Sequence, residues 1–495
     1  MLPKEPGLEM DFTLESERSG IVDEPAFQLL MLGDWSSDQA RGDWGHRRPI
    51  EVDRDNFDDV MRSLDIRLEI DCDGVAVNVA LDSIDSFHPD ELFKTLPVFS
   101  ELRGLRKRLR DPQTFNSAAR EIRSSSGVPI EATREEAATP RPETPASGSL
   151  LDSILANPEG GESAARAPVS GDLAQLVEQV VRPHLTGVDE DEQASLIGGV
   201  DMGIAAVMRS ILHDRKFKDL EAAWRGLYFL VRRTETASDL RIFILDATKA
   251  EVAEDVKDQE RSSVKSTLLK GANGDPWAAF FGNYAYAADV DDIAAIIRIG
   301  KIAASAKTPF ISHIRPDILG VASLSDRPDP DEWDLSGESS GGKLWSAVRE
   351  LPESKFVGMT MPRFLARLPY GSLTEPTEAF SFEEIVDPGD TSNLLWSNGC
   401  FVAAQLLAAS YSQFGWQFGE QYVQDVDGLP MYVFRNGGET IQQPSAEVQL
   451  SQNSAEKLME YGVMPLVSFK DSDRVRLLRL QSITDPVSRL AARWG

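Results

Sequence analysis

The stretch that decides the fold runs from Phe217 to Asp246. It reads FKDLEAAWRGLYFLV at 217–231 and, after a short polar interval, RIFILD at 241–246. The first part spaces its apolar residues by three and four positions, which predicts an amphipathic helix, and the second is a short apolar run typical of a buried strand. A helix that leads into a buried strand argues for a mixed α and β protein and against a helical bundle or a β-sandwich.

The same alternation of helices and strands extends in both directions. Upstream, FQLLMLG at 27–33 predicts a buried strand that ends at a glycine turn, and residues 66–70 and 75–79 alternate apolar and polar residues as paired strands do. We therefore expect an α/β (α+β) fold. Further helices are expected at 56–61, 88–93, 196–212, 290–304, 344–350, 364–368 and 393–414, and further strands at 309–312, 432–434, 446–450 and 465–469.

Composition divides the chain into two modules. Residues 124–170 are rich in Pro, Gly, Ser, Ala and Glu, a composition that cannot bury enough apolar surface to offset the entropy of the chain. We therefore expect a linker at 124–170 between an N-terminal module (residues 1–123) and a larger C-terminal module (residues 171–495).

One short apolar segment interrupts this linker. SLLDSIL at 149–155 begins with a serine that can cap a helix, and it predicts a short helix over 149–156. A helix of this length is unstable alone, so it either binds a partner as a docking peptide or packs onto the following module. Its apolar residues at helical spacing are Leu150, Leu151, Ile154 and Leu155.

The charge of the chain excludes several classes of partner. Its 495 residues include 51 Lys and Arg against 80 Asp and Glu, a net charge of −29. Nucleic acids and anionic membranes attract basic proteins, so we expect neither as a partner. The chain has no run of 18 apolar residues and no apolar leader, and Cys72 and Cys400 stand far apart. We therefore expect a cytoplasmic protein without disulfides.

One basic cluster occurs, in the helix expected to follow residues 88–93. The run lacks interleaved aromatic residues and its surroundings are acidic, which favours a solvated or partner-facing helix over a nucleic-acid site. The cluster consists of Arg103, Arg106, Lys107, Arg108 and Arg110, interleaved with Leu102, Leu105 and Leu109.

A phosphate-binding loop is suggested by only one stretch. Residues 337–343 read GESSGGK, but Leu344 stands where such a loop needs a magnesium-holding hydroxyl, and an acidic, proline-broken stretch precedes it instead of a strand. A nucleotide enzyme built on this loop is the least favoured alternative. The five histidines show no paired metal-binding spacing, so we expect no metal, no cofactor and no catalytic site.

Ordered segments of the chain resemble a pair of known families. The N-terminal module resembles the small subunit of the type VI secretion contractile sheath, and the rest is similar to the large sheath subunit. The segments with small-subunit similarity are 27–35, 47–70 and 87–109. Those with large-subunit similarity are 149–155, 217–231, 238–252, 280–287, 301–312, 344–350, 357–371, 378–384, 394–416 and 464–482.

The resemblance implies a mechanical function. It implies that the two modules share a mixed-sheet core in one protomer, and that a linker here joins subunits which are usually separate chains. Fusion fixes their ratio at one to one and replaces a bimolecular encounter by a high effective concentration. Such protomers polymerise into a metastable cytoplasmic tube, whose contraction drives an inner tube outward by shape change rather than by catalysis.

The resemblance also implies partners. These are other sheath subunits, the inner tube protein, the baseplate, and an AAA+ unfoldase that recycles contracted sheath by gripping the apolar helix at 149–156. The family's large subunit continues further beyond the segment that ends at Ser482 than this chain does, so we expect a C-terminally shortened large-subunit module. This departure leaves one alternative open: a non-polymerising adaptor that caps or initiates a sheath or connects it to a baseplate.

Overall fold

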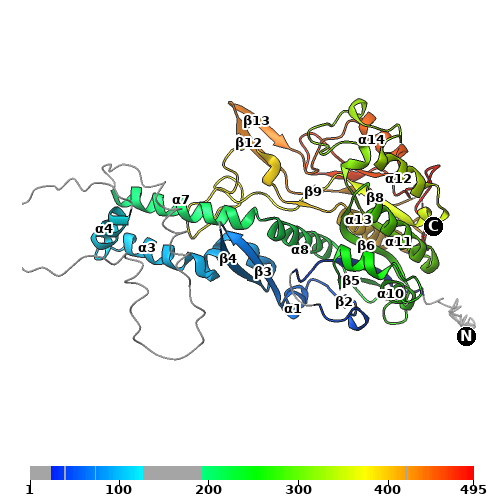
Figure 1. The fold of residues 1–495 in the computed structure, drawn as a ribbon, viewed down its shortest axis with the longest axis horizontal. Helices are drawn as coiled ribbons and strands as arrows, with labels where there is room; N and C mark the ends of the chain where they lie inside the picture. The colour runs from blue at the N-terminus through cyan, green and yellow to red at the C-terminus, as the bar shows by residue number, and fades with distance from the viewer. Residues whose placement is uncertain (1–23, 38–40, 73, 126–191, 420, 495) are drawn as a thin grey trace, which may run out of the picture.

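The computed structural model describes residues 24–37, 41–72, 74–125, 192–419 and 421–494. Figure 1 shows an elongated molecule in which a body with a large sheet lies at one end and an arm of helices extends from it to the other end. Strands and helices alternate through the body, so the predicted α/β class is confirmed.

The body is organised by a nine-stranded sheet in the order β11-β15-β14-β8-β7-β6-β1-β5-β2. The six strands from β14 to β5 run parallel, whereas β2, β15 and β11 are antiparallel to their neighbours. The sheet is therefore mixed. Its strands are β1 (Phe27–Gly33), β2 (Ile50–Glu51), β5 (Leu240–Asp246), β6 (Trp277–Tyr286), β7 (Phe310–Ile314), β8 (Val357–Met361), β11 (Asp425–Val426), β14 (Met464–Ser468) and β15 (Val475–Leu477).

Strand β1 of the N-terminal module lies inside the sheet of the C-terminal module. All seven of its residues are buried. It pairs in parallel with β5 from Phe27 opposite Leu240 to Gly33 opposite Asp246, and on its other edge with β6. A strand buried on both faces and paired on both edges belongs to the core. The expectation that the two modules share a mixed sheet is thus confirmed.

Helices cover both faces of this sheet, and the side chains of β1 alternate between the two layers. Leu29 and Met31 enter one hydrophobic cluster, which includes α8 (Arg215–Arg233) and α13 (Cys400–Phe414). Leu30 and Leu32 enter the other cluster. The helices on that second side are α9 (Lys249–Asp255), α10 (Ser263–Lys270), α11 (Val290–Ala306), α12 (Ser340–Arg349) and α14 (Gln452–Glu460).

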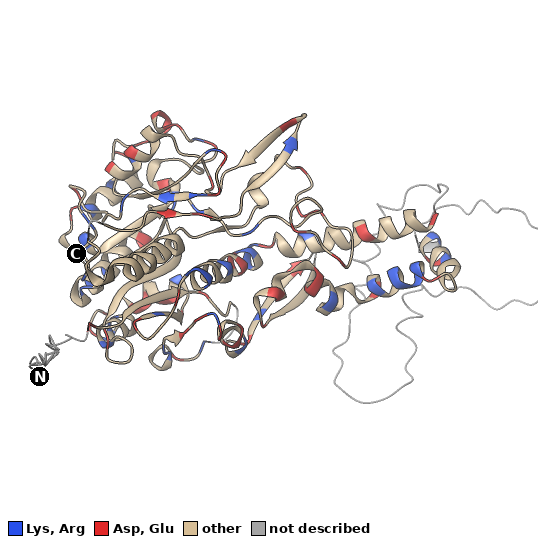
Figure 2. Ribbon diagram, turned by 180° about the vertical axis from the view of Figure 1, so that it is seen from behind, with Lys and Arg blue, Asp and Glu red and all other residues tan. Residues whose placement is uncertain are grey.

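The arm combines elements of both modules. From the N-terminal module come α3 (Ser100–Arg110) and α4 (Phe115–Ser125), which pack beside α7 (Glu192–Leu212) of the C-terminal module (Figure 1). Figure 2 shows the basic residues of α3 along this arm. At its base lie α1 (Phe57–Ser63), α2 (Pro89–Thr95) and the hairpin of β3 (Ile66–Cys72) and β4 (Val75–Leu81).

Among the described helices, α7 is the one that is long and apolar enough to pass as a membrane span. Its mean hydropathy is 1.5, and 56% of the window is buried inside the protein. Val200, Ile204 and Met208 are fully buried at helical spacing, so the apolar character of α7 is explained by packing in the arm.

The remaining elements are short. A hairpin of β12 (Tyr432–Asn436) and β13 (Glu439–Gln443) projects from the body, and β9 (Phe364–Leu365) pairs with β10 (Trp396–Ser397). Single turns of 3₁₀ helix occur at Trp44–His46, Ile84–Phe87, Pro97–Phe99, Pro316–Leu319, Pro330–Glu332, Pro352–Phe356, Thr391–Asn393 and Gly415–Gln417.

Three sequence-based predictions are wrong in this part of the chain. The expected helix at 364–368 is instead β9 and a loop, because Pro369 disfavours a helical Leu368 and β10 supplies a pairing edge. The helix predicted to start at 393 begins only at Cys400, whose N–H is accepted by the Asn398 side chain at 2.9 Å. The expected strand at 446–450 is absent, and only Ala446 pairs there, with Phe364.

Candidate functional site

The region with the densest contacts between the two modules lies around β1 and the loop that follows it, and we call it the sheet seam. Asp246 at the end of β5 accepts hydrogen bonds from the Trp35 N–H at 2.8 Å and from the Ser36 hydroxyl at 2.5 Å. Arg41 adds an ion pair from Nε to Asp246 Oδ2 at 3.2 Å. One carboxylate of the C-terminal module therefore holds the loop after β1.

A second ion pair crosses the sheet seam beside the first. Arg47 Nη2 lies 2.5 Å from Glu251 Oε1, and its Nη1 donates to the Asp246 carbonyl at 3.0 Å. Partial burial raises the pKa of Glu251, but hydrogen bonds from Arg47 and Thr248 outweigh this effect and lower the pKa to about 2. Glu251 is therefore ionised. Its pairing with Arg47 joins the loop that precedes β2 to the first turn of α9.

Aromatic side chains also pack across the sheet seam. Trp35 and Trp224 are fully buried and meet edge to face with ring centroids 5.4 Å apart. The indole N–H of Trp224 donates to the Trp35 carbonyl at 3.0 Å. At the start of β1, Phe27 stacks on Tyr411 at 4.5 Å, and Trp416 donates to the Pro25 carbonyl at 2.7 Å. The Trp224 and Trp416 indoles thus each donate a hydrogen bond across the seam, as buried indoles usually do.

A separate contact between the modules lies in the arm, and we call it the arm seam. Arg106 of α3 forms two parallel hydrogen bonds to Asp201 of α7, from Nε at 2.5 Å and from Nη2 at 3.1 Å. Both side chains are about nine-tenths buried. This two-pronged geometry is the strong form of an arginine–carboxylate pair.

Helix α2 is held to the C-terminal module by its first turn. The Asp90 carboxylate accepts the N–H groups of Glu378 at 2.9 Å and Ala379 at 3.0 Å, and Phe93 packs against Phe380 with ring centroids 4.9 Å apart. The segment around residues 378–380 therefore grips α2 through both polar and apolar contacts.

Behind that segment lies a buried ionic network within the C-terminal module. Arg367 bridges Glu221 of α8 at 2.7 Å and Glu384 at 2.7 Å, and Arg225 also pairs with Glu221 at 2.6 Å. Burial raises the pKa of Glu221, but Arg367 and Arg225 outweigh it and hold the pKa below its ordinary value. The network anchors the segment between residues 367 and 384 to α8.

The sequence-predicted partner-binding residues are Leu150, Leu151, Ile154 and Leu155. They lie outside the residues that the structure describes. So does the predicted linker at 124–170, apart from Ser124 and Ser125, which are the last residues of α4. The docking helix at 149–156 therefore stays a prediction.

The glycine-rich stretch 337–343 forms the loop and first turn of α12. The Ser339 hydroxyl caps this helix by accepting the Gly342 N–H at 3.1 Å, Lys343 is exposed, and Leu344 packs against the core. A single 3₁₀ turn, not a strand, precedes the loop. Its glycines and serines are thus explained by helix capping.

The described histidines have different structural roles. His88 caps α2 and His313 is buried in β7, where burial and the Arg363 charge lower its pKa to about 4. Among the described ranges, no three His, Cys, Asp or Glu side chains gather as metal ligands would.

Sequence reasoning missed the role of Arg106, which it placed in a solvated or partner-facing basic run. A signal was present, because Leu102, Arg106 and Leu109 lie at positions i, i+4 and i+7 and thus share one face of α3. An arginine on an apolar face indicates a buried ion pair. The glutamates and arginines of the network around Arg367 carried no comparable pattern, since their partners are more than 140 residues apart in two cases.

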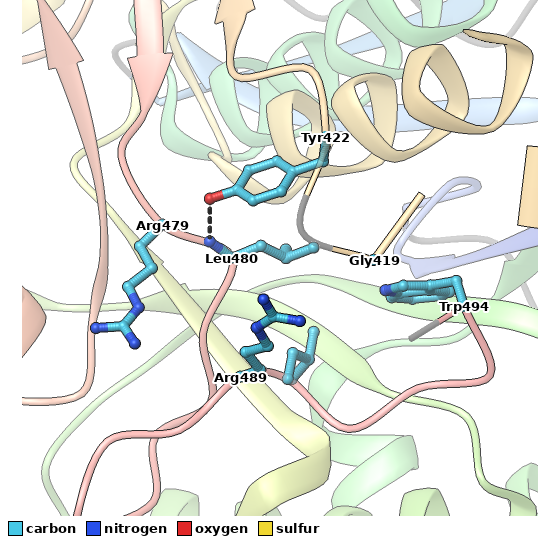
Figure 3. A pocket seen from close by; sticks show the side chains of 7 residues that line it. Gly419, Tyr422, Arg479, Leu480, Arg489 and Trp494 are labelled. Carbon is cyan, nitrogen blue, oxygen red and sulfur yellow. Dashed lines mark hydrogen bonds between the residues drawn. The ribbon is translucent and has the colours of Figure 1, made fainter. Parts of the chain in front are cut away.

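One open cavity of about 200 Å³ lies near the C-terminal end of the body, shown in Figure 3. Tyr422 and Trp494 form parts of its wall, and Arg479 lies on the side opposite Trp494. The Tyr422 hydroxyl accepts the Leu480 N–H at 3.0 Å. The full lining is Gly419, Tyr422, Arg479, Leu480, Arg489, Leu490 and Trp494.

Comparison with known proteins agrees with this two-part architecture. A family model described as EvpB/VC_A0108, tail sheath N-terminal domain, matches residues 194–484, and one described as Type VI secretion system, VipA, VC_A0107 or Hcp2, matches residues 4–124. The chain is also similar to the type VI secretion system sheath protein TssC1 of Pseudomonas aeruginosa (strain PAO1), with 32% identity over 306 residues.

The alignment with TssC1 covers 59% of this chain and 61% of the relative, so the chain spans less than two thirds of that protein's length. The tail sheath model, in contrast, covers more than half of the present chain. This chain, in which small-subunit and large-subunit sequences are joined, therefore belongs to the family of type VI secretion system sheath proteins.

Proposed function

We propose that the chain acts as a fused one-to-one protomer of a cytoplasmic contractile sheath. The observation that carries this proposal is β1, a strand of the small-subunit part that lies between β5 and β6 of the large-subunit part. Removing β1 would expose two inner strand edges of the sheet, and such edges pair with other chains. The two parts therefore work as one rigid piece.

The proposed action is a change of packing between protomers. Copies stack into a tube in an extended arrangement, and contraction to a lower-energy arrangement propels an inner tube outward. No bond is made or broken in this scheme, because the free energy is stored in the contacts between protomers. What the protomer must supply is stiffness, and the sheet seam and arm seam support that role by joining the parts at two separate places.

Expression of the full chain alone, followed by negative-stain electron microscopy, tests this proposal. A polymerising protomer gives tubules with a regular helical lattice. Single particles that bind only to the ends of preformed sheath would instead support the alternative, a non-polymerising adaptor that caps, initiates or connects a sheath.

A second test addresses the shared core. A protease site inserted between residues 140 and 147 allows the chain to be cut after folding, and we expect the two halves to co-elute on size-exclusion chromatography. Separation of the halves in native buffer would contradict a joint protomer. The insertion site lies in the proline-rich stretch PRPETPAS at 140–147, which ends before the expected helix at 149–156.

We also propose that the segment 149–156 binds a recycling AAA+ unfoldase through Leu150, Leu151, Ile154 and Leu155. The support is the helical spacing of four apolar residues in a polar, proline-rich stretch. Replacing Leu151 and Ile154 by Asp should abolish capture by the unfoldase in a pull-down, while Ser149→Asp, which keeps the apolar face, should not. Unchanged capture by the Leu151 and Ile154 variant would overturn this site.

A further inference from the structure

The loop at 371–377 presents a fully exposed leucine at its tip. Leu373 is 96% exposed, the highest value among the large apolar side chains of the described residues. The loop is nevertheless firmly held. The Ser372 N–H and hydroxyl donate to Glu383 at 2.9 and 2.6 Å, and the Thr374 hydroxyl donates to the Pro369 carbonyl at 2.5 Å. The loop therefore holds Leu373 in a fixed position, where a second molecule can reach it.

The chemistry around Leu373 is acidic. Glu375, Glu378 and Glu383 are exposed along the same loop and the irregular segment that follows it. The loop therefore offers an apolar tip surrounded by negative charge. A surface that accepts it needs an apolar hollow with positive charge at its rim.

The cavity near the C-terminal end combines apolar side chains with cationic ones. Tyr422, Leu480 and Trp494 supply apolar surface, and Arg479 and Arg489 supply guanidinium groups at the lining (Figure 3). Trp494 is held in place because it stacks on Phe418 with ring centroids 5.5 Å apart. A cavity of about 200 Å³ is larger than the roughly 150 Å³ needed to admit benzene, so one leucine side chain fits.

The arginines of the neighbouring strand show why Arg479 stands out. Arg474 and Arg476 pair with Asp427 and Asp425 at 2.5 and 2.6 Å. Arg479 is exposed and forms no ion pair with any carboxylate in the part of the chain that the structure describes. Its charge is thus available to an acidic group from another molecule.

The loop and the cavity lie on different parts of the molecule. The loop segment is tied to α7, because the Arg209 guanidinium donates to the Glu383 carbonyl at 3.0 Å, whereas the cavity is lined by residues next to the C-terminus. Figure 1 shows the last turn of α7, which contains Arg209, near the middle of the molecule, and the C-terminus at the end of the body away from the arm. Two different patches that fit one another produce a head-to-tail contact, which is the kind of contact that builds rings or open helical tubes.

We propose that the Leu373 loop of one copy inserts into the Trp494 cavity of the next copy. Leu373 fills the cavity, and Glu375 faces Arg479. The proposal rests on the proposed function, because it assigns one of the contacts by which protomers would stack. A single leucine contact buries far less than the roughly 1,600 Å² of a standard stable interface, so it acts together with other contacts in the lattice.

Cysteine crosslinking between two full-length variants tests the contact directly. The two native cysteines, Cys72 and Cys400, are buried, so any disulfide between chains should come from the introduced cysteines. A Leu373→Cys chain and a size-tagged Arg479→Cys chain are mixed and oxidised. We expect a disulfide-linked heterodimer. The matched control replaces Leu373→Cys by Leu269→Cys, a leucine of α10 that is 56% exposed, and crosslinking should fall to background.

A charge exchange sharpens the same test. This test uses a pair that keeps Arg479, with Leu373→Cys in one chain and Leu490→Cys in the other. Adding Glu375→Arg to the Leu373→Cys chain should abolish heterodimer formation by placing two cations together, and adding Arg479→Glu to the Leu490→Cys chain should restore it. Absence of the heterodimer, or equal crosslinking of the Leu269→Cys control, overturns the proposal.

The outcome separates this inference from the proposed function. Tubules that form equally well with Leu373→Asp, without crosslinking, leave the sheath function standing and overturn the contact. Crosslinking in a preparation that forms no tubules supports the contact and contradicts polymerisation by this chain alone.

Discussion

At the sheet seam, the modules meet through seven buried residues of β1 and a backbone ladder on both of its edges, whereas at the arm seam they meet through helices and one buried ion pair, Arg106–Asp201. The apolar ladder supplies most of the free energy of association, because burial of large side chains is non-directional and strong. The buried ion pair supplies little net free energy but penalises any arrangement that leaves one partner alone.

The comparison teaches how such a chain combines strength with a defined arrangement. A strand can pair in several registers if only apolar contacts guide it, and a slip by one residue would turn Leu29 and Met31 to the other face. Asp246, at the end of β5, receives Trp35, Ser36 and Arg41 at once and so fixes the register of β1. Polar contacts therefore select the arrangement that the apolar ones stabilise.

The largest effect is expected from a charge in the centre of β1. Leu30→Asp places a carboxylate without a partner among the buried side chains of the second cluster, where burial of an unpaired charge costs several kcal/mol. We expect the cut halves to separate on size-exclusion chromatography. The control is Val433→Asp, at a residue that is 44% exposed on the projecting hairpin. Co-elution of the Leu30→Asp halves would contradict the view that the sheet seam supplies most of the free energy of association between the two modules.

The next effect concerns the arm seam. Arg106→Ala leaves Asp201 buried and unpaired, so we expect a loss of about 3 to 5 kcal/mol in the free energy of unfolding of the arm. Urea denaturation followed by circular dichroism measures it. Arg110→Ala, on the same helix but exposed, should change stability by only about 0.5 kcal/mol or less.

A double substitution at the arm seam tests whether the ion pair adds net free energy of folding or only disfavours other arrangements. Arg106→Met with Asp201→Leu removes both charges and keeps apolar volume, so stability should return close to that of the native chain. If the double variant is as unstable as Arg106→Ala, the ion pair contributes net strength, and the contrast between the two seams is wrong.

A smaller effect, dependent on pH, is expected within the sheet. Burial and the Arg363 charge lower the pKa of His313 from 6.5 to about 4, so the unfolded chain binds a proton more readily than the folded one between these values. This contribution to stability is complete above pH 6.5 and is lost as pH falls toward 4, by on the order of 3 kcal/mol. The loss between pH 7.5 and 5 should shrink in His313→Gln and persist in His46→Gln.

Below that range a second group acts at the sheet seam. The folded pKa of Glu251 lies at about 2, below its ordinary value of 4.5, so its pairing with Arg47 stabilises the fold above pH 4.5 and is lost as pH falls toward 2. Melting temperatures of Glu251→Gln and of Glu254→Gln, an exposed neighbour, should diverge above pH 4.5 and converge near pH 2.

Local patterns were sufficient to predict much of this fold from the sequence. The apolar run at 27–33 indicated a buried strand, because a strand buried on both faces is apolar throughout. The spacing at 217–231 indicated α8, because a helix buried on one face repeats its apolar residues every three or four positions. The shared sheet came from the family resemblance, since nothing in the run at 27–33 says that its partner strand β5 lies 213 residues away along the chain.

What local patterns could not show depends on distant partners. FLARL at 364–368 has helical spacing, yet Arg367 is drawn toward Glu221 and Glu384, and β10 pairs with its neighbour Leu365. Tertiary contacts override a weak local preference in such cases. The ion pairs at Arg47 and Arg367 are invisible for the same reason, because charge alone does not reveal burial. Arg106 differs, because its position on the apolar face of α3 carried a signal.

The smallest expected effect tests the remaining alternative, a nucleotide site at residues 337–343. Lys343 is exposed, and the loop's hydroxyl at Ser339 is already used to cap α12 through the Gly342 N–H. Lys343→Ala should therefore leave both the melting temperature and tubule formation unchanged, with and without ATP and magnesium. A nucleotide-dependent rise in melting temperature that disappears in Lys343→Ala would show ligand linkage at this loop, since a ligand that binds only the folded state stabilises it. Such a result would place a ligand-binding site at the start of α12, and the chain would then have a function beyond the structural one of its two seams.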